Sequence, residues 1–159
     1  MKLILVGKAA AGKDFLKNRL IAKGKKFKPG ISCTTRLPRH NEKDGVDYHF
    51  MTEEEFKAKI DSGEMLEHMV FNNWYYGLTK EEFEQADVMI MSKDGLDVLP
   101  KDYRDRCMVI WLDPPRTVRL ERLNHRNDPN DSIYRRMQTD DEQFAGFRDY
   151  DIHIKNEDF

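Results

Sequence analysis

The clearest chemical signature in the chain is the segment at residues 7–14, which reads Gly-Lys-Ala-Ala-Ala-Gly-Lys-Asp. Glycines separated by four residues and followed by a lysine are typical of a loop whose backbone N–H groups surround phosphate oxygens. Lys13 would reach the β- and γ-phosphates, and a helix starting here would add the positive end of its dipole. An apolar run at 3–6 precedes the segment and a helical pattern follows it, as this motif requires. The sequence therefore predicts that a nucleoside triphosphate binds Gly7, Lys8, Ala9, Ala10, Ala11, Gly12, Lys13 and Asp14.

Asp14 is the unusual member of this loop. It stands where such loops carry Ser or Thr, whose hydroxyl binds Mg²⁺. A carboxylate is also a ligand that Mg²⁺ accepts, so Asp14 is a candidate metal ligand, directly or through water. The alternative is that Asp14 caps the helix. We expect the metal-linked role, with Mg²⁺ accompanying the triphosphate.

A second group of candidate residues occupies the middle of the chain and suits an acceptor for phosphate. It contains two arginines three positions apart and two tyrosines: Arg36, Arg39, Tyr48 and Tyr76. Two guanidinium groups and two phenol hydroxyls can bind a dianionic phosphate. The carboxylate of Glu67 lies between them in sequence and can accept hydrogen bonds from the N–H groups of a base.

A third group is basic and lies near the C-terminal third. Arg122 and Arg126 are four positions apart, so they share one face of a predicted helix. Arg136 follows after a loop. We expect the remaining arginines of this segment, Arg116 and Arg119, to be solvated.

The elements that must position these residues alternate between strands and helices. Continuous apolar runs at 3–6, 88–91 and 108–112 predict buried parallel strands, and 152–154 predicts another. Helical patterns follow at 14–23 and 132–147. The middle of the chain is polar and mixed, with a strand pattern at 46–50 and a capping box, Thr52 with Glu55, that opens a helix. The sequence therefore predicts an α/β domain with a parallel β-sheet core and one excursion.

Composition limits the remaining possibilities. The chain has 159 residues, 35% of them charged, and a formal net charge of −2, which suits one globular domain. This balance favours neither nucleic acid nor a membrane surface as partner. No apolar run is long enough to cross a bilayer, and the apolar N-terminal run is too short for a signal peptide. We expect a cytoplasmic protein, monomeric or homodimeric.

These motifs, in their order and spacing, resemble those of the guanylate kinase family of P-loop nucleoside monophosphate (NMP) kinases. The resemblance covers Gly7 to Asn156 and depends most on three blocks: Thr-Thr-Arg-Leu-Pro-Arg at 34–39, Gly-Val-Asp-Tyr-His-Phe at 45–50 and Tyr-Tyr-Gly at 75–77. It implies a P-loop NTPase fold in a single domain. The core would comprise 1–31, 86–121 and 137–159, the NMP-binding insertion 32–85 and a helical lid 122–136.

The resemblance also implies a role for each candidate residue. The acceptor phosphate would be held by Arg36, Arg39, Tyr48 and Tyr76. The base would be contacted by Ser32 and Glu67. The transferring phosphoryl group would be stabilised by Lys13, Arg122, Arg126 and Arg136, with Arg135 as the alternative to Arg136. Asn156 would lie near the adenine of ATP.

Three positions at the expected base site depart from the family pattern. Leu78 replaces a small hydroxyl residue, and Ile90 and Ser92 replace two aspartates. The expected reaction is transfer of the γ-phosphoryl group of ATP to GMP or dGMP, with Mg²⁺. The altered contacts leave open a kinase for another or a modified nucleotide, such as a pyrimidine deoxynucleotide in a virus with modified DNA. A non-catalytic guanylate kinase-like binding module is a further alternative, which the intact Gly12-Lys13 pair and the three lid arginines disfavour.

Overall fold

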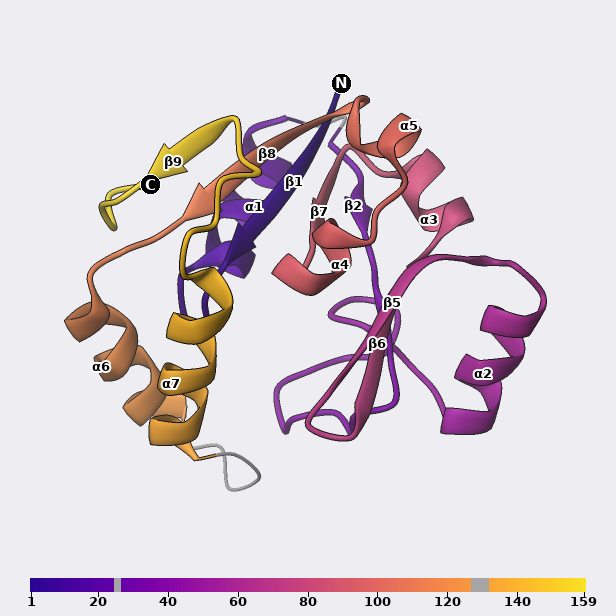
Figure 1. The fold of residues 1–159 in the computed structure, drawn as a ribbon, viewed down its shortest axis with the longest axis horizontal. Helices are drawn as coiled ribbons and strands as arrows, with labels where there is room; N and C mark the ends of the chain where they lie inside the picture. The colour runs from indigo at the N-terminus through magenta and orange to yellow at the C-terminus, as the bar shows by residue number, and fades with distance from the viewer. Residues whose placement is uncertain (25–26, 127–131) are drawn as a thin grey trace.

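The computed structural model describes residues 1–24, 27–126 and 132–159 of the chain. Its central layer is a five-stranded sheet in the order β2-β7-β1-β8-β9 (Figure 1). Each neighbouring pair of these strands is parallel, as the apolar runs predicted. The strands are β1 (Lys2–Gly7), β2 (Pro29–Gly30), β7 (Val88–Ile90), β8 (Cys107–Leu112) and β9 (Ile152–Ile154). Because all of them end at the same edge, that edge gathers the loops that carry functional groups.

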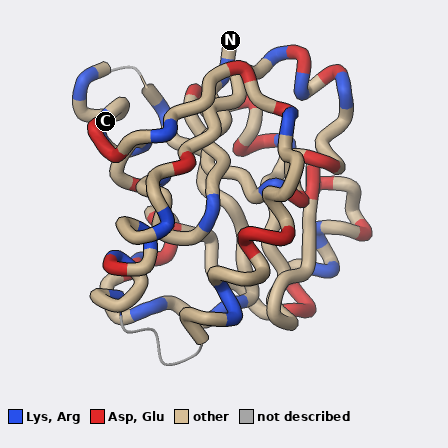
Figure 2. Tube along the Cα trace, turned by 60° about the vertical axis from the view of Figure 1, so that its left-hand side comes forward, with Lys and Arg blue, Asp and Glu red and all other residues tan. Residues whose placement is uncertain are grey.

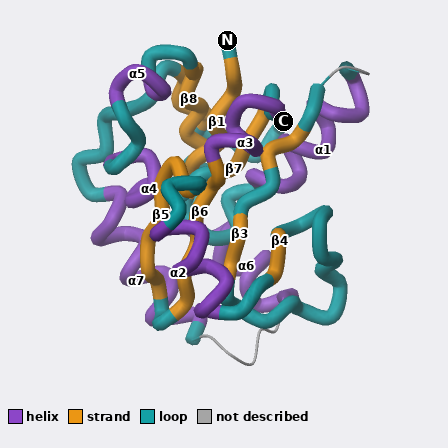
Figure 3. The backbone as a smooth tube through the Cα atoms, turned by 90° about the vertical axis from the view of Figure 1, so that its right-hand side faces the viewer, coloured by secondary structure: helices purple, strands orange, loops and turns teal. Residues whose placement is uncertain are grey.

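A second, mixed sheet comes from the middle of the chain and has the order β4-β3-β6-β5. Its strands are β3 (Cys33–Thr34), β4 (His49–Phe50), β5 (Met65–Phe71) and β6 (Trp74–Thr79). The antiparallel hairpin of β5 and β6 turns through Asn72 and Asn73, whose φ angles of 52° and 64° match the tight turn that hairpins favour. Figure 3 shows helix α2 beside this hairpin.

Seven helices connect and cover the sheets in the described part of the chain. They are α1 (Lys13–Lys23), α2 (Glu53–Asp61), α3 (Lys80–Gln85), α4 (Lys93–Asp97), α5 (Lys101–Arg104), α6 (Arg116–Arg126) and α7 (Ile133–Phe144). Hydroxyl side chains start several of them: Thr52 forms the predicted capping box of α2, and Ser92 caps α4. Helices α6 and α7 contact each other on the side of the molecule away from α2 (Figure 1).

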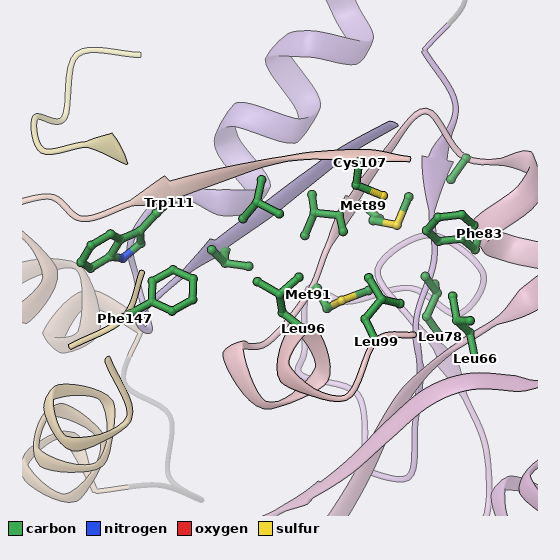
Figure 4. Close-up of a cluster of buried hydrophobic side chains, with 14 of the residues drawn as sticks. Leu66, Leu78, Phe83, Met89, Met91, Leu96, Leu99, Cys107, Trp111 and Phe147 are labelled. Atoms are coloured by element: carbon green, nitrogen blue, oxygen red, sulfur yellow. The ribbon is translucent and has the colours of Figure 1, made fainter. Parts of the chain in front are cut away.

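The main hydrophobic core lies against the parallel sheet (Figure 4). Side chains from β1 and β8, such as Ile4 and Val109, are fully buried there. Leu78 lies with Leu66 and Phe83 at one end of this cluster, whereas Trp111 lies at the other. One apolar cluster therefore joins the parallel sheet to the hairpin of the second sheet.

Two elements are shorter than their sequence patterns predict. The strand expected at 46–50 is limited to His49–Phe50 because the Asp47 and Asp44 carboxylates accept from the backbone N–H groups of Lys43 and Phe50. These side-chain bonds favour a turn over a strand. The helix expected at 132–147 ends at Phe144, and Gly146 follows in the left-handed region with a φ of 72°.

Acidic and basic residues are both scattered over the trace (Figure 2). Among the described residues, no helix has the length and apolar character that crossing a bilayer requires.

Candidate active site

The loop at 7–14 joins β1 to α1, and its backbone carbonyl groups contact the side chain of Lys13. The Nζ atom of Lys13 donates to the carbonyl oxygens of Gly7 and Lys8, at 2.6 and 3.0 Å. Burial lowers the pKa of Lys13 to about 8. Glycine is required at position 7 because a Cβ atom there would lie 2.5 Å from the carbonyl oxygen of Leu112. The ammonium group is thus already inside the loop, where phosphate oxygens would replace its carbonyl partners.

Helices α6 and α7 contact this loop directly. The backbone N–H of Ala9 donates to Oδ2 of Asp140 in α7 at 2.8 Å. The Nη1 atom of Arg122 in α6 donates to the carbonyl oxygen of Ala10 at 3.0 Å. Lys8 extends toward α7 as well, where its Nζ atom donates to Asp141 at 3.1 Å. The loop therefore depends on the two helices that carry the predicted lid arginines.

Asp14 lies in the first turn of α1 and is mostly exposed, with 68% of its side chain accessible. Its Oδ1 atom accepts from Nζ of Lys17 at 3.1 Å. The N-cap of α1 is Gly12, and no side chain caps the helix there, so the capping alternative for Asp14 is not supported. One exposed carboxylate beside the loop suits Mg²⁺, which is usually held by one or two carboxylates together with substrate phosphates. The described residues contain no group of three or more His, Cys, Asp or Glu that could hold a metal without a nucleotide.

The two arginines at the start of the second sheet are bridged by a carboxylate that the sequence reasoning missed. Nη1 and Nη2 of Arg36 donate to the two carboxylate oxygens of Glu42, each at 3.0 Å. Arg39 donates to Glu42 through its backbone N–H at 2.9 Å and through Nη1 at 3.4 Å. Burial alone would raise the pKa of Glu42, but these bonds lower it. Glu42 is therefore an anion that fixes the orientation of both guanidinium groups.

The two predicted tyrosines lie beside these arginines. The rings of Tyr48 and Tyr76 meet edge to face with centroids 6.1 Å apart, and the guanidinium carbon of Arg36 lies 5.4 Å from the Tyr48 ring. Burial raises the pKa of Tyr48 to about 12. Its hydroxyl therefore remains a proton-bearing donor at neutral pH, as binding of a phosphate oxygen requires.

Glu67 of β5 lies at the far end of the same cavity. Glu67 is 7% exposed, and this burial raises the pKa of its carboxyl group to about 7. A hydrogen bond with the backbone of Leu78 acts in the opposite direction and lowers the pKa. A Cβ atom on Gly95 of α4 would lie 2.5 Å from Oε2 of Glu67, so glycine at 95 leaves room for the carboxylate. Ser92 faces the cavity too, and its hydroxyl accepts from the backbone N–H of Gly95 at 3.0 Å.

Most of the predicted residues meet in two adjoining cavities. The larger group lines one cavity: Gly7, Ala9, Lys13, Ser32, Arg36, Arg39, Tyr48, Glu67, Tyr76, Ser92 and Arg136. The other cavity is lined by Ala10, Gly12, Lys13, Asp14, Arg122 and Arg126. Ala11 is buried and lines a third cavity, which Lys13, Asp14 and Arg39 also line. Lys13 belongs to both cavities and so marks the place where they meet.

Leu78 and Asn156 are placed differently from the expectation. Leu78 is fully buried in the core, in one cluster with Leu66 and Phe83, instead of facing the cavity. Asn156 is exposed, and the three residues after it line the cavity beside Gly12. Arg135 lies 5.3 Å from the Phe71 ring, whereas Arg136 lines the cavity with Lys13.

The expectation for Arg119 was wrong. A solvated side chain was expected, but Arg119 is only 2% exposed and pairs with Asp140 and Asp141. Arg116 does have an exposed side chain, and it pairs with Asp141. No local sequence signal pointed to this group, because Arg119 and its two carboxylate partners lie on different helices.

Comparison with known proteins fits this geometry. The family model described as Guanylate kinase matches residues 1–159. The guanylate kinase of Helicobacter pylori (strain ATCC 700392 / 26695) is 36% identical over 163 residues, spanning 98% of this chain and 79% of that protein. The guanylate kinase of Ruegeria sp. (strain TM1040) is 37% identical over 98% of this chain and 76% of its own length.

A solved structure shares the fold. The crystal structure of guanylate kinase from Anaplasma phagocytophilum superposes with a TM-score of 0.73 at 24% identity, covering 99% of this chain and 77% of that one. Together with the two-cavity site and the P-loop between β1 and α1, these matches show that the chain belongs to the guanylate kinase family.

Proposed function

We propose that this protein is a kinase that transfers the γ-phosphoryl group of ATP to GMP or dGMP. The observation that carries the proposal is the position of Lys13, which lines both the cavity of the phosphate loop and the cavity of Arg36 and Tyr48. A donor triphosphate on the loop and an acceptor monophosphate on the arginines would therefore meet at one ammonium group. Their arrangement suits phosphoryl transfer, which needs positioning and positive charge more than covalent chemistry.

The residues have distinct roles in this proposal. Arg36 and Arg39, oriented by Glu42, and the phenols of Tyr48 and Tyr76 hold the acceptor phosphate. That phosphate is already an anion, so no general base is needed. Lys13 and the lid residues Arg122, Arg126 and Arg136 stabilise the charge on the transferring group. Closure of the cavity around them would exclude water and suppress hydrolysis of ATP.

Glu67 supports guanine as the acceptor base. A buried carboxylate in a cavity favours a base that presents two adjacent N–H donors, because each donor satisfies one carboxylate oxygen. Guanine offers such a pair at N1 and at its exocyclic amine, whereas adenine and the pyrimidines do not offer two adjacent donors in this arrangement. Ile90, Met91 and Ser92 line this end of the cavity without adding a charge.

Mg²⁺ is the expected cofactor of ATP here. Asp14 and the triphosphate would hold it, and the ion would neutralise charge on the β- and γ-oxygens. The carboxylate of Asp14 would exchange its present contact with Lys17 for the metal. Replacing Asp14 with Ala should therefore raise the Mg²⁺ concentration needed for half-maximal ATP binding, which calorimetric titration of ATP at varied Mg²⁺ measures.

The decisive experiment is an ADP-release assay with ATP and each of GMP, dGMP, AMP, CMP, UMP and dTMP. We expect turnover with GMP and dGMP, and a loss of about a hundredfold or more in Lys13→Ala because one charge at the transferring group is removed. Preference for a pyrimidine nucleotide would contradict the guanine assignment alone. GMP binding by calorimetry without turnover of any nucleotide would instead identify a binding module.

A further inference from the structure

The phosphate loop contains a backbone conformation that its own sequence does not favour. Ala10 has a φ angle of 59°, in the left-handed region where the Cβ atom crowds the following carbonyl oxygen. Glycine lacks this atom and adopts the conformation without that cost, as Gly12 does with a φ angle of 98°. Inside the loop, the backbone N–H of Ala11 donates to the carbonyl oxygen of Lys8 at 3.1 Å and closes the turn. This bond does not remove the crowding at the Cβ atom of Ala10, so contacts from outside the loop would add to the stability of the conformation.

Helices α7 and α6 supply such contacts, α7 to the backbone N–H of Ala9 and α6 to the carbonyl oxygen of Ala10. Asp140 of α7 accepts from the backbone N–H of Ala9 at 2.8 Å, through its Oδ2 atom. Arg122 of α6 donates to the carbonyl oxygen of Ala10 at 3.0 Å. The Ala10 side chain packs in a small apolar cluster with residues of the same two helices. The strained residue is thus fixed at both ends by side chains that are distant in sequence.

Asp140 forms an ion pair with Arg119, which is only 2% exposed. Nη1 of Arg119 lies 3.7 Å from Oδ2 of Asp140, and Nη2 lies 3.4 Å from Oδ1 of Asp141. Within the described part of the chain, the Nε and Nη1 groups of Arg119 have no hydrogen-bond partner. A buried ion pair with unsatisfied N–H groups is a poor source of stability. Because this ion pair lies beside the loop, we interpret it as a group that positions the loop.

We propose that Asp140 is a positioning residue that holds the left-handed turn at Ala10, and that Arg119 fixes the Asp140 carboxylate for this task. This inference rests on the proposed use of the loop for ATP. Asp140 follows Arg136 by one helical turn, and both line the cavity that contains Lys13. The bond that keeps the turn in place therefore also sets how α7 presents Arg136 to the loop.

The competing explanation is that Asp140 acts on the nucleotide directly, for example as a ligand of Mg²⁺. A glycine at position 10 separates the two explanations. Glycine removes the strain and with it the need for a contact from outside the loop. It does not replace a carboxylate that touches the ligand.

The test uses the paired substitution Arg119→Met with Asp140→Ala, because removing Asp140 alone would leave the buried Arg119 charge with only Asp141 as a partner. Binding of ATP with Mg²⁺ is measured by calorimetry without an acceptor, in the natural chain and in the Ala10→Gly background. We expect the pair to weaken ATP binding by about tenfold with alanine at position 10, and by less than about threefold in the Ala10→Gly background. Binding of GMP should weaken less than binding of ATP, because Asp140 lines the shared cavity but the proposed phosphate contacts of GMP come from Arg36, Arg39 and Tyr48.

Glu142→Ala is the matched control, since it removes an exposed carboxylate from the same helix and should leave ATP binding unchanged. Equal ATP affinity of the paired variant and the natural chain would overturn the inference. An equal loss in both backgrounds would also overturn it, in favour of a direct role for Asp140. Absence of ATP binding by the natural chain would overturn the proposed function itself, and this inference with it.

Discussion

Burial of Glu67 links the stability of the protein to the proposed binding of guanine. The carboxyl group has a pKa of about 7 in the folded protein, against an ordinary value of 4.5. Between these two pH values the folded state binds more protons than the unfolded state, so stability must fall as pH rises. Each factor of ten in proton affinity corresponds to about 1.4 kcal/mol. The charge on Glu67 therefore lowers the free energy of unfolding by about 3 kcal/mol at pH 8. Below pH 4.5 this cost disappears.

Replacing Glu67 with Gln removes the titrating group while keeping its shape. We expect Glu67→Gln to match the natural protein in free energy of unfolding near pH 4.5 and to exceed it by about 3 kcal/mol at pH 8. The same substitution should weaken GMP binding by about a hundredfold, because an amide directs a donor at the donors of the base. Stability would thus increase while the acceptor site loses its ligand.

Urea denaturation at several pH values, with GMP titrations on the same samples, measures both effects. Glu54→Gln, which changes an exposed carboxylate of α2, is the control and should leave the pH dependence unaltered. If Glu67→Gln and Glu54→Gln showed the same pH dependence of unfolding, ionisation of Glu67 would not carry the cost that its burial implies.

Three further predictions concern neighbouring groups. Gly95→Ala should weaken GMP binding by about tenfold or more, because its methyl group would displace the Glu67 carboxylate; unchanged GMP affinity in calorimetry would contradict this. Glu42→Gln should raise KM for GMP by about tenfold with KM for ATP unchanged, since it loosens both acceptor arginines; steady-state kinetics decide, and a change in KM for ATP would argue against it. Binding of ATP at about pH 8 should take up a proton, because Lys13 has a pKa of about 8 and a nearby phosphate would raise it. Calorimetry in buffers of different ionisation enthalpy should give a non-zero number of protons taken up. A value of zero would refute this account of the loop.

The sequence predicted those elements whose pattern is local. Continuous apolar runs identify β1, β7 and β8 because strands buried on both faces need no polar residues. The phosphate loop is equally local, since its glycine spacing and lysine lie within eight residues. The sequence therefore placed the parallel sheet and the loop at its edge.

Features that depend on a distant partner were not predictable in this way. Arg119 has the position of a solvated residue in an arginine-rich helix, and only the docking of α7 brings carboxylates to it. Leu78 was assigned to the base site by resemblance, but its side chain completes the core that joins the two sheets. Glu42 lies in a polar turn, where nothing local distinguishes it from surface carboxylates. Each of these outcomes is decided by tertiary packing.

The stack of Trp111 in the core gives the protein an internal optical reporter. Its ring lies parallel to the imidazole of His153 with centroids 3.8 Å apart, on the central sheet, whereas Trp74 begins β6 of the other sheet. The chain contains no further tryptophan. Emission of Trp111 therefore reports on the sheet that carries the loop at 7–14, and emission of Trp74 on the second sheet, beside Arg36 and Arg39. Single-tryptophan variants would let the two sheets be followed separately.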